Sequence, residues 1–227
     1  NAAIFNIGDS AGSVMTAVDS DDIYNYGDLA GNAMTVTNSS AIFNYGYQAG
    51  NQAASTYASY VFNSGHGVGA FSILTNVADV YNYGDNAGYQ MNMVYAADLF
   101  NYGFESGKLM TGTNGNDIYN YGSDAGLSMA VTNSSNIYGY GHNALRNAAL
   151  LDSSDVYAFG NAAGNLMIAK DSTDIFNYGM ESGKQMIATN GYEIFNYGDQ
   201  AGLAMTAVDD TFDVYNFGNL AGSHAAL

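Results

Sequence analysis

Hydrophobic and polar positions alternate in a short stretch that recurs along the whole chain. One copy begins Asp22-Ile23-Tyr24-Asn25-Tyr26-Gly27. The aliphatic residue that opens the stretch occurs twelve times, at Ile4, Ile23, Ile42, Val61, Val80, Leu99, Ile118, Ile137, Val156, Ile175, Ile194 and Val214. Ten successive spacings are 19 residues and the last is 20. A near-constant period of this length is typical of a solenoid, in which each repeat is one structural unit stacked on the next.

Each copy contains two segments with strand character. An aromatic residue follows the aliphatic one in all twelve copies, Asn follows in all but the copies with Gly139 and Ala158, and Gly ends the segment. Aromatic and β-branched residues ended by Gly predict a strand. A turn with a second Gly leads to another such segment, for example 33–37, which carries a recurring Met. Two Gly per copy would break any helix into unstable pieces.

The predicted fold is therefore all-β. We expect a β-solenoid of about twelve 19-residue coils, with two short strands per coil and amyloid-like stacking, as one domain over residues 1–227. Adjacent coils should lie ~4.8 Å apart, which gives a rod roughly 55 Å long.

The first strand has two faces, and the sequence leaves open which one is buried. We favour the aliphatic residues, Asn and Met inside, because buried Tyr hydroxyls would need partners. The opposite packing, with aromatic residues inside, would bury more area. In the favoured packing a structural Asn ladder joins the coils through Asn25, Asn44, Asn63, Asn82, Asn101, Asn120, Asn177 and Asn196. A lateral aromatic ladder then lies outside, at Tyr26, Tyr45, Tyr83, Tyr102, Tyr121, Tyr140, Tyr178 and Tyr197.

Composition excludes several function classes. The formal net charge is −17 with only four Lys and Arg residues, so nucleic acid and anionic membrane surfaces are poor partners. No apolar run reaches membrane-spanning length, so membrane insertion is not expected. The chain has no Cys, which leaves no disulfide and no Cys-ligated metal. Because the sequence begins at Asn1 rather than Met, we expect that a leader has been removed.

The motif resembles a known family of self-assembling proteins. Ile23-Tyr24-Asn25-Tyr26-Gly27, then Gly31-Asn32-x-Met34 and later Asn38-Ser39-Ser40, resembles the repeat of curli-type functional amyloid subunits. In that family the first strand carries Gln where this chain has Asn, and the repeat is longer. Similar amyloid-like repeats are implied for the protein sheaths of filamentous methanogens. The resemblance implies a secreted subunit of an extracellular filament, biofilm matrix or cell sheath.

Acidic and His residues are the candidates for chemistry. A weak candidate cation row, with Ca²⁺ as the ion, precedes the aliphatic residue at Asp79, Asp98, Asp117, Asp155 and Asp174. The alternative is that these side chains cap backbone amides in the turn. His66, His142 and His224 have no metal-ligand spacing and occupy unequal repeat positions. No catalytic set is specified, so we expect no enzyme activity and no cofactor.

Two functions from different classes remain. The first is a homopolymer subunit that stacks end to end through Ile4, Phe5, Asn6, Val214, Tyr215 and Asn216. No nucleator or secretion partner can be named. The second is a soluble β-solenoid binding protein, either ice-binding or a polysaccharide-binding adhesin, and a Thr row is the candidate surface for ice. That row contains Thr37, Thr56, Thr75, Thr113, Thr132 and Thr189, and Leu151 and Lys170 interrupt it. We see no capping unit at either end, which favours the polymer.

Overall fold

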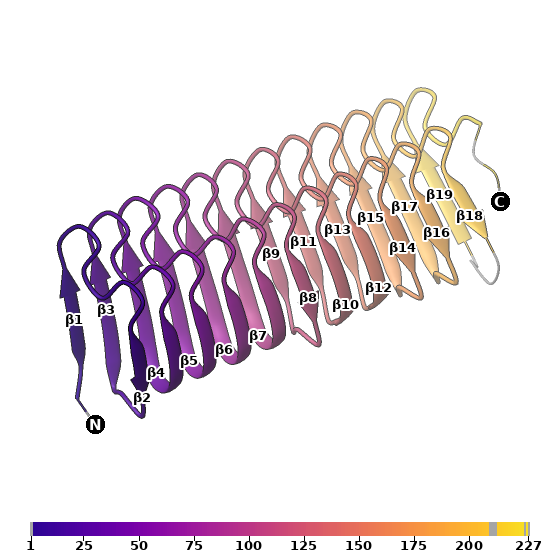
Figure 1. The fold of residues 1–227 in the computed structure, drawn as a ribbon. Helices are drawn as coiled ribbons and strands as arrows, with labels where there is room; N and C mark the ends of the chain where they lie inside the picture. The colour runs from indigo at the N-terminus through magenta and orange to yellow at the C-terminus, as the bar shows by residue number, and fades with distance from the viewer. Residues whose placement is uncertain (1, 209–212, 225, 227) are drawn as a thin grey trace.

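The chain forms one straight stack of β-coils (Figure 1). The computed structural model describes residues 2–208, 213–224 and 226. All regular elements in this part of the chain are β-strands, and all strand pairs are parallel. The two termini lie at opposite ends of the rod (Figure 1). The predicted all-β solenoid is confirmed.

Nineteen strands make up the rod. In the first half they are β1 (Ile4–Ile7), β2 (Thr16–Val18), β3 (Asp22–Tyr26), β4 (Thr35–Tyr45), β5 (Ala54–Ser64), β6 (Ile73–Tyr83), β7 (Asn92–Tyr102), β8 (Thr111–Thr113) and β9 (Ile118–Tyr121). In the second half they are β10 (Ala130–Ser134), β11 (Ile137–Tyr140), β12 (Ala149–Ser153), β13 (Val156–Phe159), β14 (Ile168–Lys170), β15 (Asp174–Tyr178), β16 (Ile187–Thr189), β17 (Glu193–Tyr197), β18 (Thr206–Val208) and β19 (Asp213–Phe217).

Equivalent residues of successive repeats pair directly. Ile4 pairs with Ile23, and Asn25 with Asn44, so the 19-residue period is the length of one coil. We number the coils 1 to 12 by the aliphatic residue that opens each, from Ile4 to Val214. Val208 pairs with Thr189 and Asp213 with Glu193. The extra residue of the last spacing therefore lies within 209–212, outside the described residues, as do Asn1, Ala225 and Leu227.

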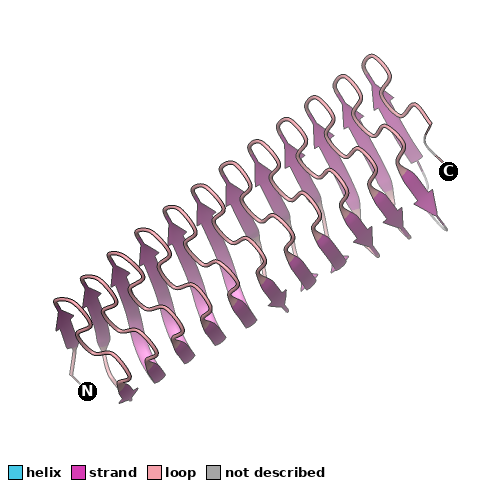
Figure 2. Cartoon of the chain, turned by 45° about the horizontal axis from the view of Figure 1, so that its top comes forward, coloured by secondary structure: helices cyan, strands magenta, loops and turns pink. Residues whose placement is uncertain are grey.

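Strands β4 to β7 differ from the prediction of two short strands per coil. Each is 11 residues long and joins the second strand of one coil to the first strand of the next. The corner between the two is a bend rather than a break, because pairing continues through it at Ser39 with Ala58 and at Ala41 with Tyr60. Figure 2 shows the loops of the opposite corner lying over one another along the rod.

The core runs along the rod between the two strands of each coil. Ile23, Met34 and Val36 are representative, and all three are buried. Asn25 is buried on the same face, whereas Tyr24 and Tyr26 point outward and are half-buried or exposed. The favoured inward packing of aliphatic residues, Asn and Met is confirmed.

The long turn of each coil continues the hydrogen bonding between coils. Its residues adopt left-handed backbone conformations at alternate positions, for example Leu29, Gly31 and Ala33 at φ 58°, 67° and 55°. This alternation turns successive amides in opposite directions along the rod. Leu29 N–H and Ala33 N–H donate to the following coil, and Gly31 N–H donates to the preceding one. The turn thus satisfies its backbone groups without leaving the stack.

The first Gly of each turn is needed because the coils approach closely there. A Cβ on Gly27 would lie 2.8 Å from the carbonyl oxygen of Gly8 in the coil before it. Gly27 also has φ 123°, which other residues rarely adopt. The same contact recurs down the rod, so these glycines form one stacked column.

Candidate assembly surfaces

Buried Asn side chains form a directional ladder inside the rod. In two runs, Asn6 to Asn120 and Asn177 to Asn216, the side-chain amide nitrogen Nδ2 of one Asn donates to Oδ1 of the Asn in the next coil, at 2.7 to 2.9 Å. The predicted residues Asn25 to Asn120, and Asn177 and Asn196, lie in this row, and the structure adds Asn6 and Asn216 at its ends. Because every bond points the same way, the ladder has a polarity.

The second Gly of the turn makes room for the ladder. A Cβ on Gly31 would lie 2.5 Å from the amide carbon Cγ of Asn25 in the same coil. Coil 8 has the reverse arrangement: Gly139 replaces the Asn, and Leu145 replaces the Gly. Leu145 is fully buried, and a Cβ on Gly139 would lie 2.5 Å from its Cγ. The two positions therefore share one space, which only one of them fills.

Two ladders of aromatic rings run along the outside of the first strand. In the first aromatic ladder, Phe100, Tyr119 and Tyr138 stack at centroid distances of 4.8 Å with nearly parallel planes. In the second, Tyr102, Tyr121 and Tyr140 stack in the same way at 4.8 Å. The eight tyrosines predicted for the lateral aromatic ladder all lie in the second row. Together the two ladders form one aromatic face.

The second aromatic ladder has a gap at Ser64, which pairs with Tyr45 and Tyr83 on either side. Phe62, in the neighbouring ladder, tilts toward this gap. Its ring lies 5.3 Å from that of Tyr45 and 5.4 Å from that of Tyr83, at interplanar angles of 39° and 33°. One ring from the first ladder thus partly replaces the ring missing from the second.

Carboxylates flank the first aromatic ladder. Tyr119 and Tyr157 donate hydroxyl hydrogen bonds to Asp117 and Asp155, each at 3.2 Å. Burial, and then the nearby carboxylate, raise the pKa of each of these two tyrosines to about 12. The folded chain therefore releases these two phenolic protons at higher pH than an unfolded chain would.

The predicted cation row also bonds to backbone. Asp98 Oδ1 accepts from the Asp117 N–H at 3.3 Å, and Asp117 Oδ1 accepts from the Asn136 N–H at 3.0 Å. Burial, and then Asp155, raise the pKa of Asp174 above its ordinary value, and a hydrogen bond from the Glu193 backbone opposes the shift. Within the described residues no three His, Asp or Glu side chains come together as metal ligands would. Hydrogen bonds to backbone amides thus account for part of this row. The predicted row also includes Asp79, and Ca²⁺ binding stays a prediction.

Among the described residues, β1 in the first coil and β19 in the last coil each have a partner strand on one edge only. Strand β1 pairs with β3, and β19 pairs with β17. Phe5 is 63% exposed because its ring is stacked on one face only, by Tyr24, whereas Tyr24 has rings on both faces and is half-buried. At the other end Ala226 bonds to the edge of β18. The predicted self-assembly residues lie at these two ends.

The remaining candidates are separate from one another. His66 stacks on Tyr47 at 5.5 Å in the long turn, and His224 lies beside Ser223 near the end. The Thr row faces outward from the second strand, where Leu151 and Lys170 pair in register with Thr residues and interrupt it. No continuous Thr face results.

Comparisons with protein families, with curated proteins and with solved structures found no match for this chain. The described part of the chain contains no helix that could span a membrane.

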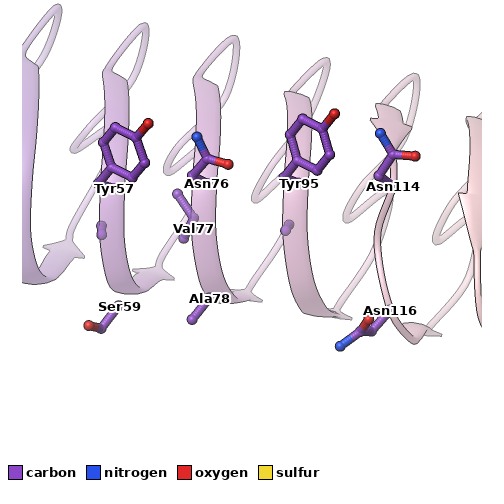
Figure 3. Close-up of a pocket in the computed structure, with 10 residues that line it drawn as sticks. Tyr57, Ser59, Asn76, Val77, Ala78, Tyr95, Asn114 and Asn116 are labelled. Carbon is purple, nitrogen blue, oxygen red and sulfur yellow. The ribbon is translucent and has the colours of Figure 1, made fainter.

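Sequence reasoning missed a groove at the corner between the second strand and the next first strand (Figure 3). Tyr57, Asn76, Tyr95 and Asn114 line one side of it, one residue from each of four successive coils. The signal was present in the sequence. Asn or Asp occupies this corner position in the other coils, so the two Tyr residues depart from the repeat.

Proposed function

We propose that this chain is a structural subunit of an extracellular amyloid-like polymer, such as a filament, biofilm matrix or cell sheath. Subunits add head to tail by stacking the last coil of one molecule on the first coil of the next. Aromatic faces then hold neighbouring rods together. The function is structural, with no catalytic step.

The observation that carries this proposal is the complementarity of the two ends of the Asn ladder. Among the described residues, Oδ1 of Asn6 accepts no hydrogen bond and Nδ2 of Asn216 donates none. One end of the rod therefore offers the amide oxygen of Asn6 as an acceptor, and the other end offers the amide nitrogen of Asn216 as the matching donor. Stacking Asn216 beneath Asn6 of another molecule would continue the ladder in its existing direction. Such a heterologous contact propagates without closing when the rod is straight.

The backbone edges are complementary in the same way. Ile118 N–H and Gly8 N–H both donate to the following coil. Alternation along a parallel strand therefore turns the N–H groups of Phe5 and Ile7 toward the open side of β1. The N–H groups of Val214 and Asn216 face the open side of β19. Unpaired strand edges of this kind are templates for another chain.

The aromatic face supports contact between rods. It runs along the rod, and its rings are half-buried or exposed rather than covered by another element. Exposed apolar surface of this extent usually marks an interface. The net charge of −17 opposes lateral contact, so acid or added salt should promote it.

Proline at the open edges tests the head-to-tail contact. Phe5→Pro and Val214→Pro each remove an N–H that faces the open side, so pairing within the rod is kept. The matched controls Phe5→Ala and Val214→Ala keep the N–H and remove the side chain. We expect the double Pro variant to remain folded and to form polymers at least about tenfold shorter than the double Ala variant, because each Pro deletes a ladder bond.

Polymer length is measured by electron microscopy, and folding by circular dichroism, at neutral pH and at pH 4. Polymers of equal length from the Pro and Ala variants would contradict end-to-end β-pairing. So would a parent chain that stays monomeric at high concentration and pH 4.

A further inference from the structure

The corner row is the set of residues that bend each coil between its second strand and the next first strand. Its members with described conformations are Asp19, Asn38, Tyr57, Asn76, Tyr95, Asn114, Asn133, Asp152, Asp171 and Asn190. All ten have φ between 50° and 58°. Asn and Asp tolerate this left-handed conformation, whereas it is uncommon for a bulky side chain such as Tyr.

Tyr57 and Tyr95 therefore occupy positions that disfavour them. They also give up bonds that the row makes elsewhere. Asn38 donates to Asp19 at 3.0 Å, Asn133 donates to Asn114 at 3.0 Å, and a 2.7 Å bond joins another such pair farther along. The Tyr57 and Tyr95 side chains are 58% and 56% exposed, so they gain little packing in return. Residues that break a local rule without a structural gain are expected at functional sites.

The two Tyr residues stand along a shallow groove of about 520 Å³ that is widely open to solvent. In Figure 3 both rings project to the same side of the corner with the same orientation, and Asn76 lies between them. Ser59, Ala78 and Asn116 line the other side, so the groove follows the rod across four coils. No charged side chain lines it. The side-chain amide of Asn76 makes no hydrogen bond to another described residue, which leaves its donor and acceptor available.

We propose that this groove binds a neutral, extended, β-linked polysaccharide that lies parallel to the rod. Tyr57 and Tyr95 are two coils apart, ~9.6 Å at ~4.8 Å per coil. Consecutive sugars of an extended β-1,4-linked glycan are turned by about half a rotation, so alternate sugars show the same face to one side of the chain, at a repeat close to two coil steps. The two Tyr rings can then stack against the C–H faces of alternate sugars. Asn76 would bond the hydroxyl groups between the rings, and Asn114 those beyond Tyr95.

A proline-rich peptide is the strongest competitor. Three residues of polyproline II helix span ~9.3 Å, which also matches the spacing of the two rings. Such a peptide offers the groove carbonyl acceptors alone, because Pro lacks an N–H. Sugar hydroxyls both donate and accept, as the amides of Asn76, Asn114 and Asn116 do. The polar composition of the groove therefore favours the glycan.

Isothermal titration calorimetry with cellohexaose tests the proposal, with maltohexaose and decaproline as comparison probes. The variant Tyr57→Asn/Tyr95→Asn restores the residue that the corner row favours, so it should fold and melt no lower than the parent. We expect it to bind cellohexaose at least about tenfold more weakly, because both stacking platforms are lost. The control Tyr47→Asn removes an exposed Tyr outside the groove and should bind as the parent does.

Binding is measured in the parent and in the Phe5→Pro/Val214→Pro variant, so that failure to polymerise and failure to bind are separate results. Absence of cellohexaose binding by the parent would overturn the proposal. So would equal binding by the parent and Tyr57→Asn/Tyr95→Asn, equal binding of maltohexaose, or binding of decaproline in place of the glycan.

Discussion

The interior of coils 1 to 7 differs from that of coils 8 and 9, although all share one backbone register. In coils 1 to 7 the Asn ladder is unbroken from Asn6 to Asn120. In coils 8 and 9 Gly139 and Ala158 take the Asn position, and the ladder resumes at Asn177. At the break, Nδ2 of Asn120 and Oδ1 of Asn177 are buried without a partner.

Coil 8 shows that an apolar side chain can fill the space of the hydrogen-bonding amide without disturbing the repeat. Leu145 occupies in coil 8 the space that the Asn amide occupies elsewhere, and it does so in a left-handed conformation at φ 57°. Register survives, since Gly139 still pairs with Asn120 and Ala158. Hydrophobic packing and the backbone ladder therefore hold the rod together where the side-chain ladder stops.

The largest expected effect on stability comes from changing the two residues that share one space in coil 8, Gly139 and Leu145. Gly139→Asn alone places a side chain against Leu145, and Leu145→Gly alone leaves a cavity worth about 2–5 kcal/mol. The double variant Gly139→Asn/Leu145→Gly recreates the arrangement of coil 7, so it should recover most of the lost stability. Urea denaturation of all four proteins gives the coupling energy between the two positions. Additive effects, with no recovery in the double variant, would contradict a shared space.

A smaller effect separates the middle of the ladder from its broken end. Asn101→Ala removes two ladder bonds and leaves Nδ2 of Asn82 and Oδ1 of Asn120 unpaired. Asn120→Ala removes one bond, because its Nδ2 is already unpaired. Asn120→Ala leaves Nδ2 of Asn101 unpaired but also removes the unpaired Nδ2 of Asn120, so Asn101→Ala leaves two more buried polar atoms unpaired than Asn120→Ala does. Both create a similar cavity, so Asn101→Ala should be the more destabilising by at least about 1–3 kcal/mol, the cost of one buried unpaired group. Equal midpoints in urea would show that the ladder contributes nothing beyond packing.

Much of the fold was predictable because the same pattern of residues occurs in twelve copies. The aliphatic residue, Asn, Gly and Met recur at fixed positions, and one inward face for Ile23 and Asn25 follows from strand alternation. The left-handed conformations of Leu29 and Ala33 were not predictable. They are non-Gly residues, and the need for them arises from hydrogen bonds to coils above and below, which single-residue preferences do not express.

The surface features were predictable only where the residues that form them recur in nearly every copy of the repeat. The aromatic ladders follow from positions that are aromatic in nearly every copy. The corner groove depends on Tyr57 and Tyr95, which are exceptions, and an exception has no meaning until the conformation it departs from is known. The tilt of Phe62 toward Ser64 was equally unpredictable, because it depends on a ring that is missing from the neighbouring ladder.

The smallest effect compares coil 7 with coil 8 at the outer surface. Tyr119 in coil 7 donates to Asp117, whereas Tyr138 in coil 8 follows Asn136 at the same position. Asp117→Asn gives coil 7 the residue found in coil 8. Burial is the largest cause of the raised pKa of Tyr119 and the Asp117 carboxylate is the next, so the substitution removes the second cause. The pKa of Tyr119 should therefore fall from about 12 toward its ordinary value of 10.0. A tyrosine whose pKa is higher in the folded state stabilises the fold below pH 10, and this contribution is lost as pH rises through about 12, because the unfolded chain releases the proton first. Stability at neutral pH should be almost unchanged in Asp117→Asn, and its loss between pH 10 and 12 should be smaller than in the parent.

Phenolate absorbance against pH, with urea midpoints at matched pH, measures both quantities. The substitution Asp152→Asn, at the corner row, is the control and should leave the tyrosine titration as it is in the parent. An unchanged titration in Asp117→Asn would show that Asp117 does not contribute to the raised pKa of Tyr119.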